Sequence, residues 1–599
     1  MSVFDLPRLH FSGVATTKLP TGPRSGLVDL ATNTALTDDG PFPVHRPVQE
    51  YHDYLDQRGP RFDVAGRVTD SGAFSATKGW NFAGSGHFSI DATIVSAECA
   101  AGGIDLDDPV VGRGVDMWGH YNEYLATTFN RARVFDVDPS SEWTTTLMVG
   151  QLCFGRAGRS HDVGYMLTGD VHGLHPPRWH NFSHVMDVGD HCLAPQLRRS
   201  AVYQLVVRRD EGLRWLDEAS VSPAVTLLRS VVDSGGADGV VVQFALSSMA
   251  TPVAPDWPNH WDVRGTIAPW RAHELRTYPA GRLLTPRGPR RDGHRSRLHN
   301  LTVDVAPERV TLNMITAVPA TSRAERSGPG PTHRLGPLLD VGDLELRTMG
   351  TGQLVARVPG KAYLEDDYVL TSGIVTVPAA MPVGTADEHL LCLVGNDATG
   401  DRVVLLSEER VNLQVDDACL FLDHPKDADD PGRDVEVRVR SFVRGRPRAV
   451  DAVHVRQFFN PKALPLDDVA SSPQARCEDV DIVRLRAGRL ADSGDWSDMC
   501  TVRTDEEGRG WFTMRGKRAG STRVLLSADA HDAPCDAALP GSASTAYDNG
   551  DALGYWSGVG SLSVRVLPDD WHLDEVPQEA VTFDLVYEEV FAFYELLYS

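Results

Sequence analysis

The stretch "DVEVRVRSFVRG", residues 434–445, decides the fold class, because apolar and charged residues alternate along it. Val435, Val437, Val439 and Ser441 fall on one face of an extended strand, and charged residues fall on the other. A period of two is typical of a half-buried β-strand. The stretch therefore predicts a strand with one face in a core and its charged face toward solvent.

Further alternating stretches follow this strand, separated by turns such as "TDEEGRG" at 504–510. They cover residues 453–460, 522–529 and 560–568. Short strands at this spacing, with charged outward faces, are typical of an antiparallel β-sandwich. We therefore expect a sandwich of immunoglobulin-like type over residues 417–568.

One helix stands out in the first half of the chain, which otherwise mixes short strands with turns. It is the stretch "SPAVTLLRSVVDSGG" at 222–236. Ser222 can cap its start, Pro223 suits the first helical position, and the two final glycines end it. The apolar run at 239–247 then predicts a buried strand.

The length of 599 residues is too great for a single core, so several domains are expected. The basic run "TPRGPRRDGHRSRLHN" at 285–300 predicts a solvated loop at a domain boundary. Gly and Pro make regular structure improbable at 322–337. The expected fold class is mainly β and multidomain, in four parts: a β-rich N-terminal domain with a few helices (1–285), a second β domain (298–416), the immunoglobulin-like β-sandwich (417–568) and a C-terminal amphipathic helix (578–599).

The charge balance limits the classes of partner. The chain carries 82 acidic and 58 basic residues, for a formal net charge of −24. Non-specific nucleic-acid binding and anionic membrane surfaces both favour the opposite sign. We therefore expect neither a nucleic-acid partner nor a membrane partner.

The apolar runs, the N-terminal residues and the cysteines together predict a cytoplasmic protein. No apolar run reaches the length of a membrane span, and "MSVFDLPRLHFSG" lacks the basic and apolar blocks of a signal peptide. The eight cysteines are scattered and form no Cys-x-x-Cys pair. In so long a chain this pattern indicates reduced thiols rather than a disulfide framework.

The stretch "WGHYNEYLATTFNRARVFDVDP", residues 118–139, has the highest density of functional residue types. Aromatic faces beside paired guanidinium groups suit a planar aromatic substrate with a carboxylate, because arginine binds a carboxylate through two charge-assisted bonds. Alternatively, this is a half-buried structural segment whose arginines pair with Asp136 and Asp138. The substrate-binding candidates are Trp118, Asn130, Arg131 and Arg133, and the candidates for acid–base catalysis are His120 and Tyr121.

A second stretch, "HGLHPPRWHNFSHVMDVGDHC" at 172–192, is rich in histidine. Imidazole and carboxylate groups can hold zinc or iron, but the spacing matches no standard ligand pattern and two prolines interrupt any helix. We therefore expect surface-loop histidines and leave the metal ligands unknown. The residues concerned are His172, His175, His180, His184, His191, Asp187 and Asp190.

Standard nucleotide and nucleophile motifs are missing from the sequence. The glycines of "NFAGSGHFSID" at 81–91 precede no capped helix and are not a dinucleotide loop. The sequence contains neither Gly-x-Ser-x-Gly nor the phosphate-binding Gly-x-x-x-x-Gly-Lys. Local motifs therefore name no reaction.

The last residues, "VTFDLVYEEVFAFYELLYS" at 581–599, predict an amphipathic helix without a stop signal. We expect this helix to dock on its own body, or to pack against a segment that should follow it. Its apolar stripe consists of Phe583, Val586, Tyr587, Val590, Tyr594 and Leu597.

Several long motifs resemble one family, the chromopyrrolic acid synthases of the rebeccamycin and staurosporine pathways, with the violacein-pathway imine-dimer synthase as a relative. The resemblance runs along the whole chain in the same order and is closer to the indolocarbazole branch. It rests on "DLPRLHFSG" (5–13), "PTGPRSGLVDLATNT" (20–34), "GHFSID" (86–91), "WGHYNEYLATTFNRARVFDVDPSS" (118–141), "YPAGRLLTP" (278–286), "SVRVLPDDW" (563–571) and "FAFYELLYS" (591–599).

This resemblance implies a function in antibiotic biosynthesis. An upstream flavin-dependent tryptophan oxidase supplies indole-3-pyruvate imine, and the synthase couples two imines oxidatively through their β-carbons. Chromopyrrolic acid, a pyrrole dicarboxylate, follows. For this chain alone the resemblance leaves enzymatic activity open, as it does a homodimer and the indole substituents that are accepted.

The resemblance also implies haem or iron, held mainly by a C-terminal ferritin-like part that this chain lacks. Such modules use inward carboxylates and a Glu-x-x-His pair. No Glu-x-x-His lies on a credible helix here, and no haem ligand carries over to a numbered residue. The alternative function is a non-catalytic scaffold that binds the oxidase or shapes the active site of the ferritin-like half, since fold alone does not imply catalysis.

Overall fold

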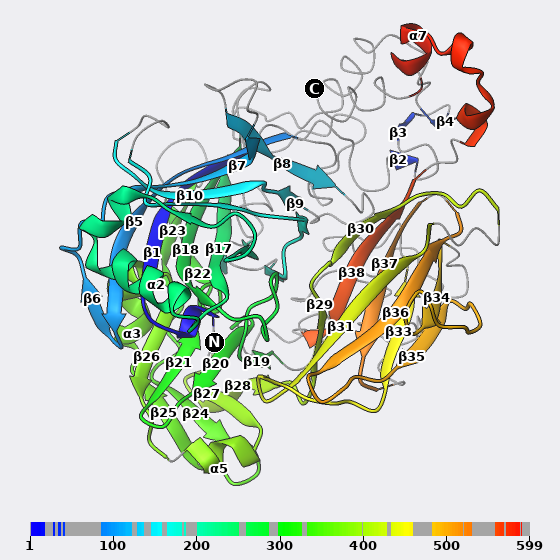
Figure 1. Ribbon diagram of the computed structural model, residues 1–599. Helices are drawn as coiled ribbons and strands as arrows, with labels where there is room; N and C mark the ends of the chain where they lie inside the picture. Colours follow the sequence, from blue (N-terminus) through cyan, green and yellow to red (C-terminus); the bar gives the residue numbers. More distant parts are fainter. Residues whose placement is uncertain are drawn as a thin grey trace.

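The computed structural model gives a chain built mainly of β-sheets (Figure 1). Helices are few and short, so the expectation of a mainly β, multidomain chain is confirmed. The residues that the structure describes are 2–17, 28–29, 34–37, 40–41, 86–121, 129–136, 145–158, 164–181, 185–186, 200–250, 259–286, 298–325, 332–381, 383–397, 399–427, 433–458, 482–518, 520–529, 558–567, 571–587 and 589.

The first body is a 14-stranded sheet with the order β13-β15-β17-β18-β1-β5-β8-β7-β10-β11-β16 along its main path. The remaining strands, β6, β9 and β12, pair at its sides. The strands are β1 (Arg8–Thr17), β5 (Gly86–Ala100), β6 (Gly103–Asp105), β7 (Gly114–Tyr121), β8 (Phe129–Asp136), β9 (Thr145–Met148), β10 (Gln151–Arg156), β11 (Leu167–Asp170), β12 (Leu174–His175), β13 (Trp179–Asn181), β15 (Ser200–Arg208), β16 (Arg214–Trp215), β17 (Gly239–Ala250) and β18 (Asn259–Trp270).

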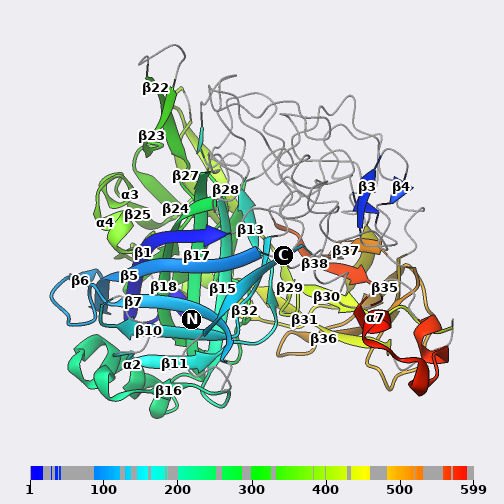
Figure 2. The same cartoon turned by 90° about the horizontal axis from the view of Figure 1, so that it is seen from above.

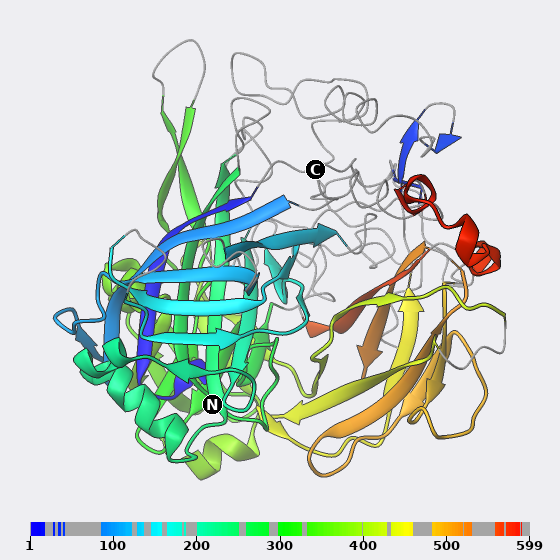
Figure 3. The same cartoon turned by 45° about the horizontal axis from the view of Figure 1, so that its top comes forward.

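This sheet curls around its own core, and Figure 3 shows its blue and cyan strands lying across the green ones. A Cβ atom at Gly169 of β11 would lie 2.1 Å from Val207 Cγ1 of β15, so two strands distant in the sheet order face each other closely. Helix α2 (Pro223–Asp233) packs on this core through Leu228 and Val232. Its start is as predicted, because the Ser222 side chain accepts a hydrogen bond from the Val225 amide.

The predicted buried strand at 239–247 is confirmed as part of β17. Both of its faces are buried, which explains its unbroken apolar run. Val240 and Val242 face the core of the first sheet, whereas Val241 packs on the other side with Val3.

The second body is an 8-stranded sheet with the order β25-β24-β27-β28-β19-β20-β21-β26 and a separate apolar core. It packs against the first sheet through buried polar contacts. Gln243 and Asn313 exchange two amide hydrogen bonds of 3.1 and 2.9 Å, and Ser372 Oγ donates to the Gly265 carbonyl at 2.7 Å. Its strands are β19 (Arg282–Thr285), β20 (Leu301–Val305), β21 (Arg309–Asn313), β24 (Leu344–Thr348), β25 (Leu354–Val358), β26 (Ile374–Pro378), β27 (Leu391–Asn396) and β28 (Arg402–Glu408).

The third body is a β-sandwich of two five-stranded sheets around one apolar core. Its strands confirm the alternation predicted from the sequence and pair antiparallel, except that β30 pairs parallel with β38. The immunoglobulin-like type remains a prediction. One sheet holds β29 (Asn412–Val415), β31 (Val435–Val443), β32 (Arg446–Pro447), β34 (Val483–Ala487) and β36 (Arg509–Gly516). The other holds β30 (Cys419–Leu422), β33 (Val453–Phe458), β35 (Met499–Val502), β37 (Gly520–Ser527) and β38 (Gly560–Val566).

The outward face of β31 corrects the sequence prediction. Val437 and Val439 are buried in the sandwich as expected, but Arg440 on the opposite face is only 4% exposed. Its Nη2 donates to the His273 carbonyl at 2.7 Å, and Phe442 packs beside Tyr278 in a shared apolar cluster. The sandwich packs against the connector between the first two bodies, so both faces of β31 are covered there.

The stretch at 322–337 also differs from its prediction, because strands occupy its beginning and its end. β22 (Ala320–Glu325) and β23 (Thr332–Leu338) pair antiparallel, and β14 (Val185–Met186) joins them. Figure 2 shows the two long strands extending from the body as a hairpin. Ladder hydrogen bonds here outweigh the local preference of Gly and Pro for loops. The basic run at 287–297 lies outside the described residues.

The remaining elements are short. They are η1 (Ser2–Phe4), η5 (Asp217–Val221), α3 (Lys361–Leu364), α4 (Asp367–Leu370), α5 (Val383–Glu388), η9 (Trp571–Glu575), η10 (Gln578–Ala580), α7 (Phe583–Val586) and the small sheet of β2 (Val28–Asp29), β3 (Thr34–Thr37) and β4 (Gly40–Pro41). Within the described ranges, no helix has the length and apolar character required to cross a bilayer.

Among the described residues, the helix predicted at 578–599 begins later than expected, after the cap at Thr582. Within the described residues, an η turn and α7 replace the first part of the expected continuous helix, and 590–599 lie outside them. Phe583 is 74% exposed and stacks with Tyr587 at 6.2 Å between ring centroids. Trp571 anchors the segment to the sandwich, since its indole N–H donates to the His424 carbonyl at 2.9 Å.

Candidate functional site

The structure places the predicted site residues on one β-hairpin, formed by β7 and β8. The strands pair antiparallel, with Trp118 opposite Arg131 and Tyr121 opposite Phe129, and an irregularity lies between these pairs. His120 lies at the end of β7, and Asn130 lies on β8. The side chains of His120, Tyr121, Asn130 and Arg131 lie outside the described residues, as does the connection 122–128.

Trp118 and Arg133 lie on the same face of the hairpin, turned away from the core of the first body. On β7, Met117 enters that core, and on β8 Ala132 and Val134 do so. Because neighbouring residues of a strand point to opposite faces, the half-buried Trp118 and Arg133 point to the face opposite that core. The register therefore gathers an indole and a guanidinium on one face of the hairpin.

A buried polar cluster beside Trp118 was not anticipated from the sequence. Asp116 accepts hydrogen bonds from Arg156 Nε at 2.7 Å, from Arg156 Nη2 at 3.3 Å and from Tyr165 Oη at 2.9 Å. All three side chains are at most 8% exposed. The one visible signal was an acidic residue within the otherwise apolar "GVDMW" of β7, and its partners lie too far along the sequence to be paired with it by inspection.

The electrostatics of this cluster favour a charged Arg156 and neutral Tyr165 and Cys153. The hydrogen bond from Arg156 to Asp116 raises the pKa of the guanidinium further. Burial, followed by the negative charge of Asp116, raises the pKa of the Tyr165 hydroxyl and of the Cys153 thiol well above their usual values. Cys153 is therefore a protonated thiol and does not supply a nucleophile.

The histidine-rich stretch is only partly a surface feature. His172 is exposed as expected, but the prediction was wrong for His175, which is 3% exposed on β12 opposite Leu147 of β9. Among the described residues neither of its ring nitrogens has a hydrogen-bond partner, and burial together with the charge of Arg276 lowers its pKa to about 3. The side chain of His180, and His184, His191, Asp187 and Asp190, lie outside the described residues.

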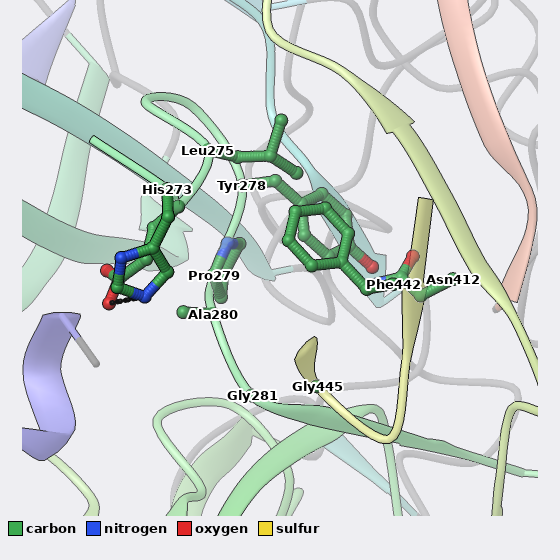
Figure 4. Close-up of a pocket in the computed structure, with 10 residues that line it drawn as sticks. His273, Leu275, Tyr278, Pro279, Ala280, Gly281, Asn412, Phe442 and Gly445 are labelled. Carbon is green, nitrogen blue, oxygen red and sulfur yellow. Dashed lines mark ion pairs between the residues drawn. The ribbon is translucent and has the colours of Figure 1, made fainter. Parts of the chain in front are cut away.

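A pocket lies where the three bodies meet, between the connector that follows β18 and strands β29 and β31 (Figure 4). His273 and Glu274 approach each other at its wall, with 3.8 Å between His273 Nε2 and Glu274 Oε1. Burial lowers the pKa of His273 and raises that of Glu274. The free space holds about one water-sized sphere, far below the roughly 300–1,000 Å³ of small-molecule sites, so an indole does not fit.

The described residues do not fit a bound iron centre. They contain no group of three or more His, Cys, Asp or Glu side chains placed to hold a metal ion. The buried imidazole of His175 lies within strand pairing of β9 and β12 and lines no part of the pocket described above.

Comparison with known proteins gives a match along the full sequence. The chain is 48% identical over 599 residues to dichlorochromopyrrolate synthase of Lentzea aerocolonigenes and covers 51% of it. It is 31% identical over 604 positions to 2-imino-3-(indol-3-yl)propanoate dimerase of Chromobacterium violaceum and covers 52% of it. In both alignments all of this chain is matched, and it spans about half the length of these curated relatives.

The comparisons with protein-family models and with solved structures indicate neither a family nor a fold. No protein-family model matches the sequence. Among solved structures, native alpha-2-macroglobulin of E. coli aligns with a TM-score of 0.12 and 9% identity over 64% of this chain and 20% of that one, a likeness too weak to indicate a shared fold. The match along the whole chain to two curated proteins confirms its resemblance to the family of chromopyrrolic acid synthases and violacein-pathway imine-dimer synthases.

Proposed function

We propose that this chain is part of a synthase that couples two indole-3-pyruvate imines oxidatively in indolocarbazole biosynthesis. The observation that carries the proposal is the 48% identity, over the whole chain, to a protein named dichlorochromopyrrolate synthase. The second relative is named for dimerising an indole-bearing imine, which is the same class of reaction. The proposed product is chromopyrrolic acid, made in the cytoplasm.

The β7–β8 hairpin is the proposed substrate site. Arg131 and Arg133 would neutralise the substrate carboxylate, with each charge-assisted bond contributing about 1.5–3 kcal/mol. Trp118 would stack on the indole, and Asn130 would add a hydrogen bond. The position of Trp118 and Arg133 on one face of the hairpin, opposite the first core, supports this assignment.

The chemistry asked of the site is a proton transfer. The enamine form of the imine carries its nucleophilic carbon at the β position, so the imine–enamine shift needs an acid and a base. His120 or Tyr121 would supply them. Joining two β-carbons removes two protons and two electrons, and peroxide from the partner flavin oxidase would accept these and become water.

In this proposal, the coupling reaction needs a second half of the protein in addition to this chain. Haem or iron is assigned to the ferritin-like half, which would also be a partner of the 599-residue chain. A Soret band from the purified chain would instead locate haem in the present half. A colourless chain without coupling activity would support the scaffold function, in which these β-domains bind the oxidase or shape the neighbouring site.

The test feeds tryptophan and a flavin-dependent tryptophan oxidase to the longer protein that contains this chain. The proposal predicts a product with the mass of chromopyrrolic acid. Recovery of only indole-3-pyruvate and its hydrolysis products would contradict it. Chlorinated tryptophan, offered in parallel, measures which indole substituents are accepted.

A further inference from the structure

The sandwich touches the first body beside the β7–β8 hairpin (Figure 1). The Thr146 hydroxyl of β9 lies 3.4 Å from the Cys419 sulfur of β30, and both side chains are buried. Strand β9 pairs with β8, where Arg133 is the register partner of Met148. Thr146 and Met148 share one face of β9, opposite the core residue Leu147. The face that carries Arg133 is therefore the face that meets the sandwich.

On the sandwich, this contact is made by the outer face of the sheet that contains β30 and β38. Along β30, Leu422 enters the sandwich core. Cys419 and Phe421 therefore point away from that core, because neighbouring residues of a strand alternate between faces. Arg565 follows the core residue Val564 on β38 and is the register partner of Phe421. An aromatic ring and a guanidinium thus lie side by side on the face that meets the first body.

The exposure of these side chains suits a ligand that is planar and anionic. Phe421 is 41% exposed on the edge strand of its sheet, whereas Arg565 is only 2% exposed. Arg523 of β37 adds a second guanidinium on the same face, because its Nη2 donates to Ser563 Oγ at 3.5 Å. Charge-assisted bonds to a carboxylate are stronger where water is excluded. The face can therefore hold a carboxylate on its arginines and an aromatic ring on Phe421.

The proposed coupling asks for two such sites. It joins two carboxylate-bearing molecules, and a chain with a net charge of −24 repels both of them unless local cations compensate. The hairpin supplies one combination of ring and guanidinium, in Trp118 with Arg131 and Arg133. The sandwich repeats that combination on the other side of the contact between Thr146 and Cys419.

We propose that Phe421 and Arg565, with Arg523 beside them, form a second subsite for an indole-bearing carboxylate. One imine then binds to the hairpin of the first body and the other binds to the sandwich. Two reactants held on adjoining bodies meet in a defined orientation, which removes much of the entropic cost of joining them. The identity of the ligand as an imine rests on the proposed function, whereas a second subsite for aromatic carboxylates does not.

Calorimetric titration of the 599-residue chain with indole-3-acetate counts the subsites. Wild type should bind two molecules, and Arg565→Gln and the double variant Arg131→Ala, Arg133→Ala should each bind one. The matched control is Arg440→Gln, which removes a buried arginine from the other sheet of the sandwich and should still bind two. Chromopyrrolic acid, which carries both carboxylates, should bind Arg565→Gln at least about 10-fold more weakly than wild type.

A second measurement does not depend on removing a buried arginine. Photolysis of the wild-type chain with a 5-azido derivative of indole-3-acetate should label peptides from the hairpin, residues 114–136, and from β30, residues 419–422. Label confined to the hairpin would overturn the second subsite. Arg565→Lys keeps the charge but loses the two-pronged geometry, so it should still bind two molecules, the second one several-fold more weakly.

The possible outcomes separate this inference from the proposed function. A single molecule bound by wild type, lost in the hairpin variant and kept in Arg565→Gln, would contradict the second subsite and leave the proposed function intact. Loss of the second molecule in Arg440→Gln as well would trace the effect to folding and overturn the subsite, as would a wild type that binds no indole-3-acetate. Two filled subsites, in a longer protein that forms no chromopyrrolic acid from tryptophan and its oxidase, would contradict the proposed function while the subsite stands.

Discussion

Trp118 on β7 and Arg131 on β8 are register partners in one antiparallel hairpin. The sequence separates an aromatic group and a basic group, and the strand pairing brings their backbones side by side. Arg133 follows on the same face as Trp118, turned away from the core. This placement makes the hairpin a testable site for an aromatic carboxylate.

The contact between Gln243 and Asn313 is expected to stabilise the packing of the first two bodies. Both side chains are fully buried and exchange two hydrogen bonds. Gln243→Leu should cost about 1–3 kcal/mol, because it leaves the Asn313 amide unsatisfied. The double variant Gln243→Leu, Asn313→Leu should cost less than the sum of the single variants, and urea unfolding measures all three. Strict additivity would show that the pair is not coupled.

Arg178 is expected to hold the sandwich against the first body. Its Nη2 donates to Gln414 Oε1 at 2.9 Å and to the Val415 carbonyl at 3.2 Å, and its guanidinium lies 5.2 Å from the Tyr278 ring centroid. Arg178→Met should lower the unfolding free energy by about 1.5–3 kcal/mol, since hydrogen bonds to a charged group are lost. The matched control, Arg208→Met, removes an exposed arginine of β15.

The readout for Arg178 is the rate of proteolysis within the native chain, together with the thermal midpoint. Faster cleavage between the sandwich and the first body is expected for Arg178→Met alone. Equal cleavage in the two variants would mean that this contact does not fasten the sandwich.

His175 is expected to make stability fall in acid. Its folded-state pKa of about 3 is below the ordinary value of 6.5, so the unfolded chain takes up a proton first as the pH falls. Stability from this group is complete above about pH 6.5 and is lost progressively toward pH 3. At pH 5 the loss amounts to about 2 kcal/mol.

The variant His175→Leu should remove this acid sensitivity. At pH 7 it should raise the unfolding free energy by about 1 kcal/mol, since neither buried ring nitrogen has a hydrogen-bond partner among the described residues. Its advantage over wild type should widen as the pH falls to 5. Denaturant unfolding at several pH values checks this, with His172→Leu, an exposed neighbour, as the control. A constant difference across pH would contradict the assignment.

Local patterns predicted the elements whose environment follows from their own sequence. Helix α2 has its cap and its stop within the quoted stretch, and β31 has its period of two. The sequence could not show that the outer face of β31 is covered, because Arg440 is buried by the His273 connector, which is remote in sequence. The surface position predicted for His175 was wrong for the same reason, because strands distant in the sequence bury it despite the neighbouring prolines.

The candidate site, too, was predictable only where it depends on local sequence. Residue types in one segment predicted an aromatic and basic surface, and the strand register agrees with that arrangement. The Asp116, Arg156 and Tyr165 cluster joins three separate strands and loops, so only the tertiary structure shows it. The roles of His120, Tyr121, Asn130, Arg131 and Arg133 remain predictions.

The most direct measurement compares Arg131→Ala, Arg133→Ala with wild type in the longer protein, supplied with tryptophan and its oxidase. The control is Arg208→Ala, Arg229→Ala, which removes the same charge from exposed ion pairs of the first body. Formation of chromopyrrolic acid is expected to fall by at least about 10-fold in the hairpin variant, because about 1.4 kcal/mol or more of carboxylate binding is lost, and to stay near wild type in the control. Undiminished coupling by the hairpin variant would contradict the assignment of the hairpin as the substrate site.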